Sequence, residues 1–290
     1  MRKILITGGS GFIGSSLSKL LKFKSVGIID TVDINTLNLC KWEAVKKLPN
    51  YDIIVHLAAM SFVPDSFKQP LSFYNNNIQS TLNILEKAKV DGSKVIFFST
   101  YVYGPPIYLP IDEKHSTNPQ NPYSQSKLIC EELCKAYHRD FGVPITIFRP
   151  FNIYGPGQNG SFFIPTIIDQ IKKELIQLGD SRPKRDFIYI DDVVAAVYLS
   201  IIKNDSLFKI YNLGTGISTS VKEIVNMIVN STKSDARVAF SDQIRKGEIL
   251  DTVADISKIK RELQWLPKIT INRGIGLCID DNKKRKRVGE

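Results

Sequence analysis

The sequence predicts an α/β fold in which a parallel β-sheet is covered by helices on both faces. Short apolar runs, typical of strands buried on both sides, alternate with helix-like segments along the first half of the chain. We expect strands at residues 3–7, 26–29, 52–57, 94–98 and 145–148, and helices at 15–21, 39–48, 71–89 and after Tyr123. This alternation predicts a doubly wound sheet of the Rossmann type.

A glycine pattern stands between the first predicted strand and the first predicted helix. Gly8, Gly11 and Gly14 let the backbone approach a pyrophosphate, which would rest on the N-terminus of the helix. Asp30 closes the second predicted strand, where a carboxylate accepts hydrogen bonds from an adenosine ribose and repels a 2′-phosphate. No Arg or Lys follows within several residues, so the sequence favours NAD over NADP as the cofactor.

Tyr123 and Lys127 are four residues apart at the start of a helix-like run, so their side chains lie on one face. A neighbouring ammonium favours the phenolate and should lower the pKa of the Tyr123 phenol, making it a usable base. Ser99 follows the strand at 94–98, at the sheet edge where ligands bind, and could hydrogen-bond the same substrate oxygen. Together with the glycine pattern, these residues predict redox chemistry at a hydroxyl group.

A second lobe is expected beyond the alternating pattern, because residues 154–160 form a turn-rich segment typical of a domain crossing. We expect residues 1–154 to form an NAD-binding Rossmann domain, with 187–213 returning to its sheet as a strand, a helix and a strand. Residues 155–186 and 214–280 would form a smaller mixed α/β substrate-binding lobe. Ligand should lie in the cleft between the two parts.

The composition is that of a globular protein, with 290 residues, 43% hydrophobic and 23% charged. No apolar run reaches the about 18 residues of a membrane span, and the start of the chain does not resemble a signal peptide. The four cysteines show neither metal-ligand spacing nor a disulfide framework, and we expect Cys130 and Cys134 to be core residues of a reduced, cytoplasmic protein.

The net charge of +10 includes a terminal run of five basic residues, at 283–287. We expect 281–290 to be a solvated, disordered tail, with neither nucleic-acid binding nor stable membrane association. The remaining positive charge suits a protein that binds diphosphates.

Further motifs carry a resemblance to a known family. They are His56-Leu57-Ala58-Ala59, the run from Ser99 to Gly104, Tyr-x-x-x-Lys, Arg149-Pro150-Phe151-Asn152, the run from Arg185 to Asp192, and the run from Tyr211 to Gly216. With the glycine pattern, they resemble the extended short-chain dehydrogenase/reductases, and among these the NAD-dependent epimerase/dehydratase family, near the UDP-glucose 4-epimerases. The likeness covers about residues 1–270, in order and at near-family spacing.

The resemblance implies a role for each matching residue. Tyr123 is the implied catalytic base, Lys127 lowers its pKa and holds the nicotinamide ribose, and Ser99 is the hydroxyl partner. The implied cofactor-binding residues are Gly8, Gly11, Phe12, Ile13, Gly14, Asp30, Asp33, Ile34, Leu57, Ala58, Ala59, Tyr123, Lys127 and Phe151. The implied substrate-binding residues are Ser99, Asn152, Ile176, Leu178, Arg185, Arg245 and Glu248, with the arginines on the diphosphate.

Several positions depart from the family pattern. Only two residues separate Asp30 from Asp33, which predicts that a helix or an edge strand of the sheet is missing. Ser61 and Phe162 stand where relatives often carry a cofactor-contacting Lys and a phosphate-binding Asn. Thr100 and Tyr101 stand where dehydratases carry an Asp-Glu pair. Elimination of water needs an acid and a base, so their absence argues against a 4,6-dehydratase.

The resemblance implies NAD-dependent C4 epimerisation of a nucleoside-diphosphate sugar through a 4-keto intermediate, with UDP-glucose or UDP-galactose favoured and the N-acetyl sugars open. An NAD(P)H-dependent reductase of a 4-keto nucleotide sugar would use the same three residues. A non-catalytic nucleotide-sensing protein on the same fold is the alternative from another class. Relatives commonly form homodimers through a four-helix bundle, which 71–89 and 126–141 would form here.

Overall fold

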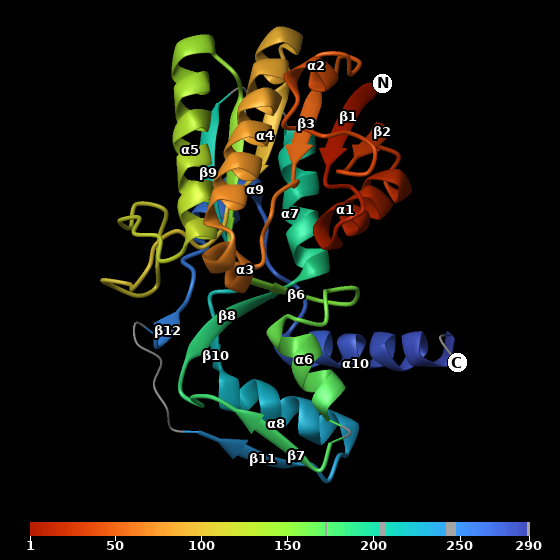
Figure 1. The fold of residues 1–290 in the computed structure, drawn as a ribbon, viewed down its shortest axis with the longest axis vertical. Coiled ribbons are helices and arrows are strands. Elements are labelled where there is room, and N and C mark those ends of the chain that lie inside the picture. The colour runs from red at the N-terminus through yellow and green to blue at the C-terminus, as the bar shows by residue number, and fades with distance from the viewer. Residues whose placement is uncertain (172, 204–206, 242–247, 289–290) are drawn as a thin grey trace.

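The computed structural model describes residues 1–171, 173–203, 207–241 and 248–288 of the 290-residue chain. Figure 1 shows a larger part with a parallel sheet between helices, and below it a smaller part built from short strands and helices α6, α8 and α10. The N-terminus lies in the larger part and the C-terminus in the smaller one.

The main sheet has six parallel strands in the order β2-β1-β3-β4-β5-β9. They are β1 (Arg2–Thr7), β2 (Gly27–Val32), β3 (Ile53–His56), β4 (Lys94–Phe98), β5 (Ile145–Pro150) and β9 (Phe208–Leu213). Every residue of β3, β4 and β5 is buried, as expected of strands covered on both faces. The predicted doubly wound α/β fold is confirmed.

Two hydrophobic cores lie on opposite faces of this sheet, because alternate residues of each strand point to opposite sides. On one face α1 (Phe12–Phe23) and α7 (Ile190–Lys203) pack on Ile4 and Ile6. On the other face α4 (Pro70–Asp91) and α5 (Pro122–Phe141) pack on residues such as Ile54. Cys130 and Cys134 are fully buried in the second core, as predicted.

The connection between β2 and β3 is short. The predicted helix at 39–48 is only the single turn α2 (Trp42–Val45), and residues 33–52 contain no strand. β2 is therefore an edge strand of the sheet, which agrees with the missing element predicted from the Asp30–Asp33 spacing. After β3, α3 (Val63–Lys68) precedes α4.

The smaller part combines short strands and helices. Strands β6 (Asn152–Tyr154), β8 (Lys184–Tyr189), β10 (Ser218–Ser220) and β12 (Asp251–Thr252) form one sheet, and β7 (Leu175–Leu178) pairs with β11 (Arg237–Phe240). The helices are α6 (Phe163–Gln170), α8 (Val221–Thr232), α9 (Ser257–Leu263) and α10 (Ile271–Val288), of which α9 lies against β9 of the larger part. The prediction that 187–213 returns to the main sheet as a whole was wrong, because β8 pairs with β6, β10 and β12; only α7 and β9 return.

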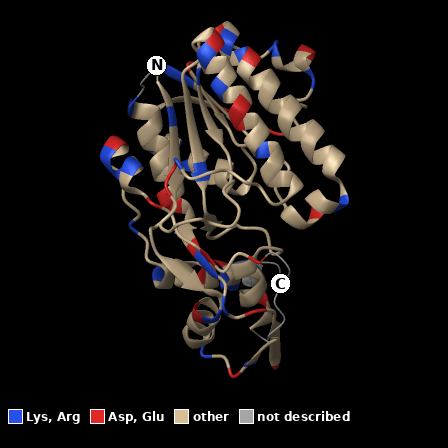
Figure 2. Ribbon diagram, turned by 90° about the vertical axis from the view of Figure 1, so that its left-hand side faces the viewer, with Lys and Arg blue, Asp and Glu red and all other residues tan. Residues whose placement is uncertain are grey.

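The end of the chain also differs from the prediction. The expected disordered tail at 281–290 is helical as far as Val288, where α10 ends. Figure 2 shows Lys and Arg interspersed with Asp and Glu over both parts of the molecule in that view. Within the described residues, no helix has the length and apolarity needed to span a bilayer, and no group of His, Cys, Asp and Glu could hold a metal ion.

Candidate active site

The glycine pattern forms a tight turn between β1 and α1. Gly8 has a φ of 71°, a left-handed conformation that favours glycine. A Cβ on Gly14 would lie 2.2 Å from the carbonyl oxygen of Gly8, so only glycine allows this approach of helix to turn. Gly11 caps α1 without a side-chain hydrogen bond, which leaves the amides of the first turn, including those of Phe12 and Ile13, available to an anion. The cradle fits a dinucleotide pyrophosphate.

The carboxylate at the end of β2 is not the one predicted. β2 continues to Val32, whose carbonyl accepts the amide of Gly8 at 2.7 Å, so Asp33 directly follows the strand end beside the glycine turn. Asp30 lies opposite Leu5, inside the strand, and accepts a hydrogen bond from the Tyr51 phenol at 3.0 Å. The ribose contact of Asp30 stays a prediction, and Asp33 is a second candidate for it, because pairing with β1 extends the strand by two residues past Asp30.

The loop after β2 is ordered by Asp33 itself. Its Oδ1 accepts the amide of Asn35 at 3.0 Å, and its own amide donates to the Thr36 hydroxyl at 2.9 Å. Ile34 is 68% exposed, so its side chain is free to contact a ligand at this edge.

The segment Leu57-Ala58-Ala59 leaves β3 at the same edge. The amide of Ala58 donates to the Thr7 hydroxyl at 3.2 Å, and Thr7 also contacts Nδ1 of the buried His56 at 2.7 Å. One residue later, Met60 donates its amide to Oδ1 of Asn77 at 2.8 Å. The path of this segment along the cofactor side is thus fixed by side chains of β1 and α4.

Asn77 is a residue that the sequence reasoning missed. Besides Met60, it donates to the Ser126 hydroxyl at 2.9 Å, so it joins the end of β3 to the helix that carries Tyr123 and Lys127. It is 1% exposed. A buried amide at a core-facing position of a helix was the available signal, since buried polar groups need partners.

Ser99 has a buried hydroxyl with no hydrogen-bond partner among the described residues. Its amide donates to the carbonyl of Phe148 at 2.8 Å, which fixes the residue at the end of β4. Buried hydroxyls are almost always paired, so an unpaired one at a ligand-binding edge suits a substrate oxygen.

Tyr123 and Lys127 lie one turn apart on α5, whose start is capped by Asn121 through the amide of Ser124 at 2.8 Å. The ammonium of Lys127 is 4.1 Å from the centroid of the Phe97 ring, and Lys127 is 2% exposed. Burial raises the pKa of the Tyr123 phenol, and a hydrogen bond with Thr100 lowers it by less. The lowering of this pKa by Lys127 stays a prediction, whereas Thr100 is a contact that the sequence reasoning missed.

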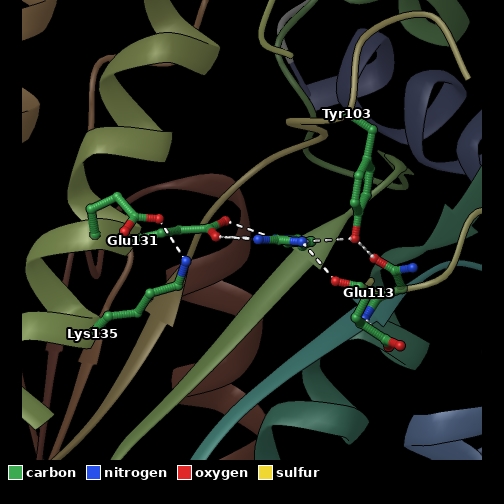
Figure 3. A network of polar contacts seen from close by, with 7 residues as sticks. Tyr103, Glu113, Glu131 and Lys135 are labelled. Atoms are coloured by element: carbon green, nitrogen blue, oxygen red, sulfur yellow. Dashed lines mark hydrogen bonds and ion pairs between the residues drawn. The ribbon is translucent and has the colours of Figure 1, made fainter. Parts of the chain in front are cut away.

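A buried polar network holds the surrounding elements together (Figure 3). Arg149, near the end of β5, donates to the Glu131 carboxylate of α5 at 2.5 and 3.0 Å and to the Tyr103 phenol at 3.1 Å. Tyr103 in turn donates to Oδ1 of Asn212 in β9 at 2.5 Å. The network connects the helix of the Tyr-Lys pair to the ends of β5 and β9.

Phe151 and Tyr101 pack together beside this network. Phe151 is buried, and its ring centroid is 5.3 Å from that of Tyr101. The Tyr101 phenol donates to the carbonyl of Gly104 at 2.6 Å, and burial raises its pKa to about 12. At neutral pH this hydroxyl is a hydrogen-bond donor held by the backbone, so it is a poor acid or base for elimination.

Three of the predicted substrate residues, Arg185, Glu248 and Asn152, make polar contacts within the protein. Arg185 and Glu248 form an ion pair at 2.6 Å, and Arg185 is close enough to Tyr101 to lower its pKa slightly against the effect of burial. Asn152, at the start of β6, donates to the carbonyl of Asp186 at 3.3 Å.

The remaining predicted substrate residues are Ile176, Leu178 and Arg245. Ile176 of β7 is fully buried in the core, so its side chain is not available to a base, whereas Leu178 is half-buried. Arg245 lies outside the described residues.

Phe162 and Ser61, the two departures from the family pattern near the expected cleft, have different surroundings. The ring of Phe162, just before α6, meets the ring of Phe62, just before α3, at a centroid distance of 5.9 Å. The contact joins the two parts of the molecule at the starts of α3 and α6. Ser61 is exposed, and its side chain is much shorter than the Lys that relatives often carry at this position.

The phosphate cradle, the free Ser99 hydroxyl and the Tyr-Lys pair meet at one sheet edge and define a dinucleotide-dependent enzyme of the short-chain dehydrogenase/reductase type. The chain belongs to the NAD-dependent epimerase/dehydratase family, whose sequence model matches residues 4–214. NAD is its cofactor, and the family acts on nucleotide sugars as epimerases, dehydratases or reductases.

Individual relatives span several of these activities. The chain is 30% identical to a UDP-glucose 4-epimerase of Halalkalibacterium halodurans, covering 91% of this chain and 90% of the relative. It is 33% identical to a GDP-6-deoxy-D-talose 4-dehydrogenase of Aggregatibacter actinomycetemcomitans, covering 89% and 90%. It superposes on a UDP-glucose 4-epimerase of Thermotoga maritima solved with UDP-glucose, with a TM-score of 0.90, 29% identity and coverage of 98% and 99%.

Proposed function

We propose that the protein is an NAD-dependent 4-epimerase of a nucleoside-diphosphate sugar, with a UDP-sugar favoured. The observation that carries this proposal is the unpartnered, buried Ser99 hydroxyl at the same sheet edge as Tyr123 and Lys127. A single serine and a single phenol suffice to move one proton at one hydroxyl group. The chemistry therefore centres on the oxidation state of one carbinol carbon.

Each of these residues has a distinct task. Tyr123 removes the proton of the sugar 4-hydroxyl and returns it after the 4-keto intermediate has turned. Ser99 donates its free hydroxyl to the same oxygen and stabilises the charge that develops there. Bound NAD supplies the acceptor and donor of the C4 hydride. The cradle at Gly8, Gly11 and Gly14 and the carboxylate of Asp33 would hold that cofactor.

Substrate binding should be strong at the diphosphate and weak at the sugar. Arg185 is held by Glu248 and by the carbonyl of Ile249 at 2.7 Å, so a diphosphate would meet a pre-oriented guanidinium. Asn152 of β6 is paired with Phe187 of β8, two residues from Arg185 on the same strand. A sugar held only through its diphosphate can present either face for hydride return. The UDP-glucose complex of the Thermotoga relative supports the choice of a UDP-sugar.

Dehydration is less well supported than epimerisation. The two positions where the resemblance places an acid-base pair hold Thr100, bonded to Tyr123, and Tyr101, bonded to Gly104. A 4-keto-sugar reductase or dehydrogenase remains the second candidate, because the Aggregatibacter relative is named for that reaction and the same Ser, Tyr and Lys would serve it.

The test is proton NMR of the purified protein with UDP-glucose, UDP-galactose and their N-acetyl counterparts, with no added cofactor. We expect the C4 epimer to appear, which requires NAD to co-purify. Tyr123→Phe should lose most of the rate, by about 10²–10⁴-fold, while still retaining NAD. Absence of conversion even with added NAD, together with reduction of a 4-keto sugar by NADPH, would favour the second candidate.

A further inference from the structure

The side chain of Lys127 is buried away from solvent. It is 2% exposed, and the neighbour of its ammonium is the Phe97 ring rather than a carboxylate within ion-pair distance among the described residues. Burial lowers the pKa of this amine, because desolvation disfavours the charged form. A lysine that must stay cationic beside Tyr123 therefore needs a compensating anion nearby.

Four titratable groups interact electrostatically with Lys127, and they come from β3 and α5. His56 of β3 is fully buried, and its pKa is lowered to about 3, so it is neutral. Cys130 and Cys134 of α5 are buried thiols whose pKa values are raised, so they are neutral as well. Glu131 is the remaining group, one helical turn beyond Lys127 on the same helix.

Glu131 is built into the fold as an anion. It is fully buried, and the Arg149 guanidinium contacts both of its carboxylate oxygens at 2.5, 3.0 and 3.1 Å. The side chain of the next residue, Glu132, is 60% exposed and pairs with Lys135 at 2.6 Å. Two adjacent glutamates thus differ in one respect that matters here, since only one shares the buried environment of Lys127.

We propose that Glu131 is a positioning residue for the reaction, the buried counter-ion that keeps Lys127 an ammonium, with Arg149 fixing its carboxylate. Arg149 comes from β5 and is joined to Tyr103 on its far side, whereas Glu131 lies one helical turn from Lys127 on the same helix. The arrangement Lys127–Glu131–Arg149 alternates in charge through the interior. Low polarity makes such interactions longer in reach than at the surface.

Loss of the Glu131 charge should also change the pKa of the base, Tyr123. An ammonium at Lys127 favours the Tyr123 phenolate, so loss of the Glu131 charge makes the amine easier to deprotonate and raises the pKa of Tyr123. The acid limb of a pH–rate profile should then move to higher pH. The inference rests on the catalytic role proposed for Lys127, but Lys127 itself can be observed without any substrate.

The experiment is an NMR titration of the Lys127 Cε–Nζ group in protein labelled at lysine, assigned with Lys127→Arg. In Glu131→Gln we expect the pKa of Lys127 to fall by about one pH unit, a tenfold shift toward the neutral amine. Glu132→Gln is the matched control and should leave it unchanged. An unchanged Lys127 titration in folded Glu131→Gln overturns the proposal, whatever the activity on sugars.

A second variant covers the case in which Glu131→Gln does not fold because it leaves Arg149 buried and unpaired. Glu131→Gln/Arg149→Gln removes both charges, and it should show a smaller fall in the Lys127 pKa, because loss of the Arg149 cation offsets part of the loss of the Glu131 anion. An unchanged titration in this double variant would equally refute the role of Glu131. A structural role alone would lower the melting temperature without moving the Lys127 titration or the acid limb.

Discussion

The phenol of Tyr51 donates a hydrogen bond to the carboxylate of Asp30, 3.0 Å away, inside the edge of the main sheet. Asp30 is therefore engaged with the second hydrophobic core, to which Tyr51 belongs. Asp33, three residues later, follows the strand end beside the glycine turn. The two carboxylates are close in sequence, but Asp30 lies inside the strand and Asp33 directly after it.

Substitution of these two carboxylates should affect the affinity for NAD to different extents. Asp33→Asn is expected to weaken NAD binding about 10-fold or more, the cost of a hydrogen bond to a charged group, and to narrow the preference for NAD over NADP. Asp30→Asn should change NAD affinity by less than about 3-fold. Calorimetric titration of the cofactor-free protein measures both. The reverse order of effects would restore the ribose role to Asp30.

Gly14 should tolerate no side chain. In Gly14→Ala the new Cβ would meet the Gly8 carbonyl oxygen 2.2 Å away, so the helix or the turn must move. We expect a loss of about 1–3 kcal/mol in the free energy of unfolding, together with weaker NAD binding. Gly276→Ala is the control, because nothing lies within 4 Å of its Cβ and alanine favours a helix. Urea unfolding of both variants tests this, and equal stability would contradict it.

His56 should make stability depend on pH. Its pKa falls from 6.5 to about 3 on folding, so the unfolded chain binds the proton first as the pH drops. The stabilisation is complete above the unfolded pKa and is lost toward the folded one. When the pH is lowered from 6.5 to 5, the free energy of unfolding should fall by about 1.5–2 kcal/mol more in the wild type than in His56→Gln. Urea unfolding at the two pH values measures this difference. Equal losses of unfolding free energy in both proteins would exclude His56 as the cause.

A homodimer through α4 and α5 also stays a prediction. These helices expose Leu71, Val90 and Phe141 at 71%, 66% and 55%, a set of apolar side chains on neighbouring helices. We expect twice the 32.7 kDa chain mass by light scattering at micromolar concentration. Val90→Lys should shift the protein toward the monomer. Phe23→Lys, on the distant helix α1 and 82% exposed in the wild type, should not. A wild type that is monomeric under these conditions would rule the dimer out.

The sequence by itself determined the parts that local chemistry specifies. The glycine turn of Gly8, Gly11 and Gly14 and the one-turn spacing of Tyr123 and Lys127 depend on a few consecutive residues, so their geometry could be predicted from the chain alone. The fully apolar runs predicted a sheet buried on both faces for the same reason. Family resemblance then assigned their chemistry.

Only the tertiary structure decided what depends on residues far apart in the chain. Pairing with β1 extended β2 two residues past Asp30 and placed Asp33 at the strand end. Packing of α5 on β5 joined Glu131 to Arg149 across 18 residues, and the smaller sheet brought Arg185 to Glu248 across 63. No local pattern encodes such pairs, because a buried charge finds its partner only when the elements that carry both have packed together.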